Sequence, residues 1–347
     1  MNKSTLQILL SIAIFYISLL AYSQVEVQEH YHTVYATQIP KTLFFANESV
    51  PLSKIDIKER LDKELLINHY WQSKTILLIK RAKKYFSIIE PILKEHNVPD
   101  DFKYLAVAES GLENVTSPAG AKGYWQFLKN TGIEYGLEIN QEVDERYHLE
   151  KSTKAACMYL NEAYNEFGNW TLAAAAYNRG KSGIKKAIET QRTNNYYDLF
   201  LNNETYRYIF RIIAIKEILS NYEKYGFIID ETDFYQTPEY YELTTKNTIE
   251  NIIDFSINLN INYKLLKQLN PWIISNTLSK PNYTIKIAKK NIQDSYKNDT
   301  IIHTCNAKDN LFEIARKYET SIEKILTWNN ILPSKKLKKN QKIIILK

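Results

Sequence analysis

The chain has 347 residues, which is enough for two or three domains, and 44% of them are apolar, so a substantial core can form. The formal net charge is +6, and the last 47 residues alone carry ten Lys or Arg against four Asp or Glu, so the basic character belongs to the C-terminus. This distribution favours an anionic polymer as the partner of the tail, and nucleic acid is disfavoured because the chain begins like an exported protein.

The first 23 residues have the pattern of a signal peptide. One lysine precedes an apolar run from Leu6 to Ala21, and Ala21 and Ser23 sit where a cleavage site before Gln24 requires small residues. The alternative is an uncleaved anchor helix. No cysteine follows the run, which disfavours a lipid anchor. In both cases we expect the rest of the chain to be exported, to the periplasm or cell envelope, with no transmembrane segment after cleavage.

The next part of the chain is predicted to be helical. Residues 24–75 are expected to form a loosely structured lead-in and then an amphipathic helix over "KIDIKERLDKELL". Residues 76–230 have helical periodicity almost throughout, and the linkers between the periodic segments carry Gly, Pro, Ser and Asn. This pattern predicts an all-α domain over residues 76–230.

From Tyr240 the pattern changes to short β-branched runs on either side of helical pieces. Residues 240–292 and 301–347 repeat this order, so the sequence predicts two small β-α-α-β modules in tandem. The expected fold class is therefore mainly α, with a helical domain followed by these two modules.

The two cysteines, Cys157 and Cys305, lie in different segments, and we expect two buried, unpaired thiols. A disulfide between them is the alternative in an oxidising compartment, and a metal site built on two isolated cysteines is improbable. His148 has no metal-ligand companion at a suitable spacing and is expected at the surface. The sequence thus predicts neither a metal nor another cofactor.

The first candidate catalytic residue is a glutamate near the end of a short predicted helix. Pro99 and Asp100 mark its start, and Gly111 is a natural stop. Its apolar face collects residues spaced three and four apart: Phe102, Leu105, Ala106 and Glu109. Desolvation on such a face raises the pKa of a carboxyl, and a carboxylic acid that is protonated near neutral pH can protonate a glycosidic oxygen. The alternative is a glutamate that meets a helix end or an arginine.

Five motifs then follow in order: Glu109-Ser110, "SPAGAKGYWQF" at 117–127, "VDER" at 143–146, "AAYN" at 175–178 and "ETYRYI" at 204–209. Together they resemble the lytic murein transglycosylases of the membrane-bound D type, whose catalytic domain is goose-type-lysozyme-like. The resemblance covers roughly residues 85–225 in order and spacing. It implies a lysozyme-like all-α catalytic domain.

The resemblance implies that Glu109 is the single catalytic acid and base, which cleaves the MurNAc–GlcNAc β-1,4 bond of peptidoglycan and leaves a 1,6-anhydro-MurNAc end. It also implies a set of substrate-binding residues: Ser110, Gln126, Tyr177, Asn178 and Tyr208. Trp125 and Phe127 are expected to be core residues, and Arg146 is expected to be a structural ion-pair partner.

Residues 301–346 resemble a LysM module, which implies binding to N-acetylglucosamine-containing glycans. The glycan-binding residues implied by the resemblance are Asp309, Asn310, Leu311 and Asn329. Lys308 and Asn340 stand where a glycine is usual, and Asn tolerates the positive φ of such a position. Residues 240–292 resemble a degenerate LysM module, either a weak glycan binder and spacer or a purely structural unit.

Three functions remain open at this point. The leading one is a lytic transglycosylase held on peptidoglycan glycan strands by LysM. The alternatives are a hydrolytic muramidase of the same fold, which would need a second carboxylate, and a catalytically silent peptidoglycan-binding protein.

Overall fold

The computed structural model describes residues 35–289, 300–306, 309–329, 331 and 337–346, and also residues 2, 4–5, 7, 10–13 and 15–16. The expected signal peptide lies largely outside the described residues, as does Lys308. Within the described part, no helix is both long enough and apolar enough to cross a membrane. The chain divides into Met1–Gln38 and Ile39–Lys347, and everything below concerns the second unit.

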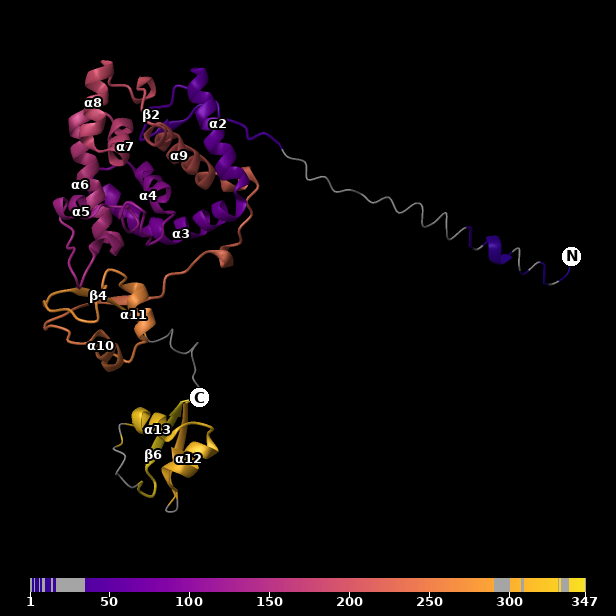
Figure 1. Ribbon diagram of the computed structural model, residues 1–347, viewed down its shortest axis with the longest axis vertical. Coiled ribbons are helices and arrows are strands. Elements are labelled where there is room, and N and C mark those ends of the chain that lie inside the picture. Colours follow the sequence, from indigo (N-terminus) through magenta and orange to yellow (C-terminus); the bar gives the residue numbers. More distant parts are fainter. Residues whose placement is uncertain are drawn as a thin grey trace. The chain divides into compact units, whose positions relative to one another are not determined.

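A helical domain forms the larger part of this unit (Figure 1). Its α-helices are α2 (Ile55–Tyr70), α3 (Gln72–Glu95), α4 (Lys103–Ser110), α5 (Lys129–Glu134), α6 (Leu149–Phe167), α7 (Trp170–Arg179), α8 (Lys181–Gln191) and α9 (Asn203–Ser220). Its 3-10 helices are η1 (Asp100–Phe102), η2 (Glu145–Tyr147), η3 (Tyr196–Asp198), η4 (Tyr222–Tyr225) and η5 (Glu231–Asp233). The predicted all-α character of this domain is confirmed.

The short helix α4 packs against both α3 and α9. Helix α7 packs between α6 and α9, because its middle is a run of four fully buried alanines, residues 173–176, whose small side chains let neighbouring backbones approach. These contacts bring the C-terminal ends of α4 and α7 to the same region as α9.

The segment before α2 is more ordered than the sequence predicted. Strands β1 (Phe44–Phe45) and β2 (Glu48–Ser49) form a small antiparallel hairpin. Phe45 is fully buried, and its ring centroid lies 5.3 Å from that of Phe102. The Glu48 carboxylate accepts hydrogen bonds from the backbone N–H groups of Trp170 (2.5 Å) and Thr171 (2.9 Å), so it satisfies free donors at the start of α7. The hairpin therefore shares the core of the helical domain.

Two modules with the predicted β-α-α-β order follow. The first module consists of β3 (Tyr240–Thr244), α10 (Ile252–Asn258), α11 (Tyr263–Leu269) and β4 (Thr284–Ala288), and its strands pair antiparallel from Tyr240 with Ala288 to Thr244 with Thr284. The second module consists of β5 (Thr300–Thr304), α12 (Leu311–Lys317), α13 (Ile322–Asn329) and β6 (Lys342–Leu346), which pair from Thr300 with Leu346 to Thr304 with Lys342. The predicted fold class is confirmed.

The first module is joined to the helical domain through residues 142–150. Val143 belongs to the hydrophobic core of the module, and the Asp144 N–H donates to the Trp272 carbonyl at 2.9 Å. The Glu142 carboxylate accepts from the Thr277 hydroxyl at 2.9 Å. The expectation that His148 is a surface residue is wrong, because its ring packs against Trp272 with 5.6 Å between centroids. That contact depends on a residue more than a hundred positions away, which local sequence does not reveal.

Candidate active site

Glu109 occupies the last turn of α4, as the sequence predicted. The helix ends because Gly111 adopts φ +62°, a left-handed conformation that glycine reaches without a Cβ clash, and the Gly111 N–H donates to the Val107 carbonyl at 2.8 Å. Phe102 and Leu105 on the same face are fully buried. Glu109 retains partial access to solvent at the edge of this apolar face.

The environment of Glu109 favours the protonated carboxyl. The pKa of Glu109 is raised from 4.5 to about 7, mainly by burial and to a smaller extent by the charge of Glu204. A hydrogen bond from the Tyr208 hydroxyl to Oε1 and the charge of Arg211 act in the opposite direction but do not offset the desolvation. At neutral pH a large fraction of the carboxyl therefore carries a proton.

Two tyrosines from different helices stand beside this carboxyl. Tyr208, on α9, is only 1% exposed. Tyr177, near the end of α7, donates its hydroxyl hydrogen to the Trp125 carbonyl at 2.8 Å. Desolvation, and after it the charge of Glu109, raises the pKa of both phenols well above its ordinary value, so both remain neutral hydrogen-bond donors. The carboxyl thus has neutral polar groups beside it.

The loop from residue 117 to residue 127 is held by its own side chains and by α4. Ser110 Oγ donates to the Tyr124 carbonyl at 2.7 Å and accepts from the Leu112 N–H at 3.1 Å. Gln126 has φ +52°, and its Nε2 donates to the carbonyls of Val115 (3.1 Å) and Gly123 (2.7 Å). Two of the predicted substrate-binding residues therefore brace the loop in the free protein.

A buried ion pair between Arg146 and Asp144 also holds this loop in place. Arg146 is 4% exposed and binds Asp144 at 2.7 Å, and its Nη1 donates to the carbonyls of Gly120 (3.2 Å) and Phe127 (3.3 Å). The structural role predicted for Arg146 is confirmed. A Cβ on Gly123, which has φ +80°, would lie 1.9 Å from the Arg146 carbonyl oxygen, so only glycine permits this approach.

The remaining predictions around the loop concern packing. Trp125 is fully buried and Phe127 is 3% exposed, so their assignment to the core is confirmed. Asn178 Oδ1 accepts a hydrogen bond from Thr205 Oγ1 at 2.9 Å, which joins α7 to α9. The structure thus brings Glu109, Tyr177 and Tyr208 together from three helices, with Asn178 next to Tyr177 on α7, Ser110 at the end of α4 and Gln126 on the adjoining loop.

Two charged residues near Glu109 were not predicted from the sequence to belong to the site. Glu204 and Arg211 lie on α9 four residues before and three residues after Tyr208, and they form an ion pair with 3.5 Å between Arg211 Nη1 and Glu204 Oε1. Both act on the Glu109 carboxyl through their charge. Their spacing of four and three residues from Tyr208 places them on the same face of α9, and this spacing could have identified them from the sequence.

The predicted glycan-binding residues of the second module also hold its fold together. Asp309 Oδ2 lies 2.8 Å from His303 Nε2 and accepts from the Asn306 N–H at 2.8 Å, and these hydrogen bonds lower the pKa of Asp309. Asn310 Oδ1 accepts from the Glu313 N–H at 2.9 Å and caps α12.

Asn329 joins α13 to β6, because its Oδ1 accepts from the Ile344 N–H at 2.7 Å and its Nδ2 donates to the Ile344 carbonyl at 2.8 Å. Leu311 packs against the apolar core of the second module. Asn340 has φ +66°, the positive value expected where it replaces glycine.

Both cysteines are buried and unpaired, as predicted. Burial raises the pKa of the Cys157 thiol to about 12, so this group is unreactive. Cys305 lies in the second module with His303 and Asp309, and their potential ligand atoms are all within 4.8 Å of one another. This is the group of described residues whose donor set could hold a metal ion. His303 already has partners in Asp309 and Tyr318.

Comparison with known proteins agrees with this architecture. Residues 86–200 match the family model of the transglycosylase SLT domain, residues 241–291 match the soluble lytic transglycosylase C-terminal LysM-like domain, and residues 303–346 match the LysM domain. The chain is 28% identical to the membrane-bound lytic murein transglycosylase D of Escherichia coli strain K12, over 83% of this chain and 68% of that protein. The homologue of E. coli O6:H1 strain CFT073 has the same identity and coverage. The chain therefore carries an SLT transglycosylase domain, a LysM-like module and a LysM module.

Proposed function

From its SLT transglycosylase domain and LysM modules, we propose that this chain is a lytic transglycosylase that cleaves the MurNAc–GlcNAc β-1,4 bond of peptidoglycan. One observation carries the proposal most directly: the pKa of Glu109 is raised to about 7 at the end of an apolar helix face. A carboxyl in this state can give up a proton and then take one back at neutral pH.

The reaction needs only this one carboxyl. Glu109 donates its proton to the oxygen that leaves with GlcNAc as the bond to MurNAc C1 breaks. The resulting carboxylate then accepts the proton of the MurNAc 6-hydroxyl, whose oxygen forms a new bond to C1. The product is a 1,6-anhydro ring, no water is consumed, and Glu109 ends protonated again. A hydrolase would instead use a second carboxylate to activate water.

The residues around Glu109 have distinct proposed roles. Tyr208 orients the carboxyl and stabilises its anion by donating a hydrogen bond, which is the contact present in the free protein. Tyr177 and Gln126 provide polar groups to the sugar beside the reacting bond. Ser110 and Asn178 hold the loop and α7 in place through their hydrogen bonds to Tyr124 and Thr205.

The LysM module is proposed to hold the enzyme on glycan strands through the segments around Asp309, Asn310, Leu311 and Asn329. The excess of Lys and Arg over Asp and Glu in its sequence suits the acidic peptides of peptidoglycan. We further propose that the chain is exported to the cell envelope, which agrees with the signal-peptide pattern and with the membrane-bound relative. No cofactor is required by the proposed reaction.

Mass spectrometry of purified peptidoglycan digested with residues 24–347 tests the proposal. Anhydro-ended products are expected from the unaltered protein and none from Glu109→Gln. Reducing-ended products, heavier by one water, would show a hydrolase. Intact peptidoglycan with both folded proteins would instead support a protein that only binds the wall.

A further inference from the structure

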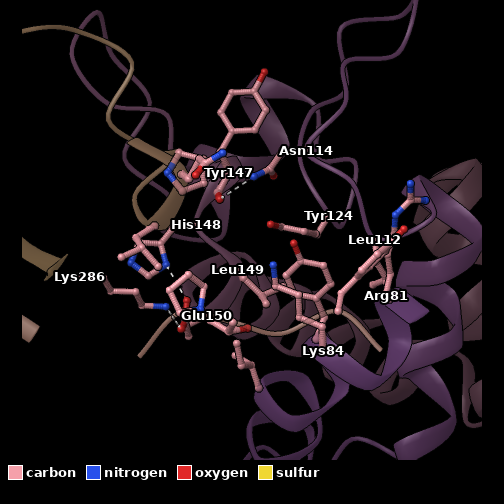
Figure 2. A pocket seen from close by; sticks show the side chains of 18 of the residues that line it. Arg81, Lys84, Leu112, Asn114, Tyr124, Tyr147, His148, Leu149, Glu150 and Lys286 are labelled. Atoms are coloured by element: carbon pink, nitrogen blue, oxygen red, sulfur yellow. Dashed lines mark hydrogen bonds and ion pairs between the residues drawn. The ribbon is translucent and has the colours of Figure 1, made fainter. Parts of the chain in front are cut away.

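A cavity of about 570 Å³ lies where the helical domain meets the first module, and we call it the junction cavity (Figure 2). Helix α3 contributes Arg81, Lys84 and Tyr85, and the first module contributes Trp272 and Lys286. Neither part forms the cavity alone. Its volume is typical of sites that bind small ligands, and Glu109 is not among the lining residues.

The cavity shares a loop with the candidate active site. Leu112, Glu113 and Asn114 line it, and they follow Glu109 directly along the chain, beyond the end of α4. A glycan strand that emerges from the active site could reach the junction cavity along this loop. The cavity is thus placed to contact the same polymer without taking part in its cleavage.

Among the described residues, the charges in the cavity leave one cation without a carboxylate partner. Arg81 forms an ion pair with Glu113, and Glu150 forms ion pairs with Lys286 and with His148 when that ring is protonated. Lys84 is partly buried and has no carboxylate partner among the described residues, and its Nζ lies 5.0 Å from the centroid of the Tyr85 ring. The electrostatic balance of the cavity therefore favours a ligand with one carboxylate.

The rest of the wall suits a sugar ring. Figure 2 shows Tyr124 on the same side as Lys84, with His148 and Lys286 opposite. The rings of Tyr85 and Tyr124 lie 5.1 Å apart, and Trp272 closes the first-module side. Aromatic faces pack against the C–H groups of sugars, while phenolic and amide groups meet hydroxyls.

Asn114, which also lines the junction cavity, has a side-chain oxygen without a hydrogen-bond partner among the described residues. The Asn114 side-chain oxygen is shielded from solvent and has no hydrogen-bond partner among the described residues, while its Nδ2 makes only a long contact of 3.5 Å with the Tyr147 carbonyl. Buried polar atoms in folded proteins normally have partners. A ligand hydroxyl or amide in the cavity would supply one after a small rotation of the Asn114 side chain.

We propose that the junction cavity is a second, non-catalytic glycan site, which holds a peptidoglycan sugar whose carboxylate pairs with Lys84. The choice of ligand class rests on the proposed function. The carboxylate has two possible sources, the lactyl group of muramic acid and the acidic peptide attached to it. The lactyl carboxylate is free only where no peptide is attached, because the peptide forms an amide with it, so each muramic acid offers one source or the other.

Isothermal titration calorimetry on residues 24–347 at low salt tests the proposal with three probes. These are the disaccharide GlcNAc–MurNAc, the same disaccharide carrying L-Ala–D-isoglutamine, and neutral diacetylchitobiose. Lys84→Gln is expected to weaken binding of at least one acidic probe roughly tenfold, since a charge-assisted hydrogen bond is lost. Binding of chitobiose is expected to stay unchanged. Tighter binding of the disaccharide alone identifies the lactyl group, and tighter binding of the peptide form identifies the stem.

Matched controls separate the cavity from other glycan contacts. Lys83→Gln changes the neighbouring lysine, which is exposed and lies near Glu231 at 3.8 Å, and it is expected to change affinity less than twofold. Gln268→Trp fills the cavity from α11 and is expected to remove the Lys84-dependent part of the binding of the acidic probes, whereas Lys264→Trp on the same helix is not. Melting curves establish that each variant is folded.

Equal affinity of both acidic probes for the unaltered protein and for the folded Lys84→Gln and Gln268→Trp variants would overturn the proposal. This outcome is distinct from failure of the proposed function. Anhydro products without any effect of Lys84→Gln would remove the second site alone. Binding that depends on Lys84 without anhydro products would leave the site and remove the lytic reaction.

Discussion

Tyr208 donates a hydrogen bond to Oε1 of Glu109 across a separation of 99 residues, and this contact places α9 at the C-terminal end of α4. It favours the carboxylate form, while burial of the same group favours the acid. The balance leaves the pKa of Glu109 close to neutral, where a single group can serve first as an acid and then as a base.

Tyr208→Phe tests this contact. Loss of the donor is expected to raise the pKa of Glu109 further and to lower kcat on peptidoglycan roughly tenfold, because the carboxylate loses a hydrogen bond that stabilises and orients it. Tyr206→Phe on the same helix is the control. A pH–rate profile gives the result. If the rate of Tyr208→Phe fell at the same pH as that of the wild type, Tyr208 would not influence the pKa of Glu109.

The pH–rate profile also tests the two charges on α9. If protonated Glu109 starts the reaction, the rate falls as pH rises through about 7, the pKa of that group. Glu204→Gln removes a negative charge that raises this pKa, so its falling limb is expected at lower pH. Arg211→Gln removes a positive charge and is expected to move the limb to higher pH. Shifts of the same sign in both variants would rule out this electrostatic account.

Glu109→Gln is expected to make the protein more stable at high pH. The folded-state pKa of about 7 is above the ordinary value of 4.5, so the contribution of Glu109 to stability is fully present below pH 4.5 and is lost as pH rises through 7. The glutamine variant lacks this dependence. At pH 8 we expect a gain on the order of 2 kcal/mol in its free energy of unfolding relative to wild type, allowing for the lost Tyr208 hydrogen bond to a carboxylate.

Differential scanning calorimetry at pH 4 and pH 8 measures this effect. The difference between the melting temperatures of Glu109→Gln and wild type should be larger at pH 8. A difference that is the same at both values would show that Glu109 titrates at an ordinary pKa in the folded protein.

Gly123→Ala tests the loop that carries Gln126. Its new Cβ would lie 1.9 Å from the Arg146 carbonyl oxygen, so the backbone must shift, and a loss of about 3 kcal/mol of stability is expected. Gly136→Ala is the matched control, because Gly136 has φ +84° with no atom within 4 Å of the added Cβ, and only the cost of the left-handed backbone, about 1 kcal/mol, should appear. Urea unfolding compares the two, and equal losses would refute the role of the Arg146 contact.

Much of this protein follows from local sequence. The helix that carries Glu109 was predictable because its apolar spacing and Gly111 are both encoded within a dozen residues. The order of strands and helices in both modules was predictable for the same reason. Burial of Cys157 followed from its position in a periodic helix.

Other features depend on contacts between distant segments. The hairpin of β1 and β2 carries little periodicity, and its order comes from Phe45 on Phe102 and from Glu48 at the start of α7. The ring of His148 is packed only because Trp272 of the first module reaches it. The charges of Glu204 and Arg211 act on Glu109 only after α9 packs against α4.

The sequence by itself determined which carboxyl ends an apolar helix face and which motifs surround it, because helical periodicity and turn residues act over short distances. The sequence predicted a raised pKa for that carboxyl, but its position near 7 depends on tertiary structure, since the burial and the Tyr208 hydrogen bond involve residues far apart in the chain. Tertiary structure also decided the junction cavity, whose walls come from the helical domain and the first module. Lys84 can be recognised as the cation without a carboxylate partner among the described residues only once the neighbouring ion pairs are known.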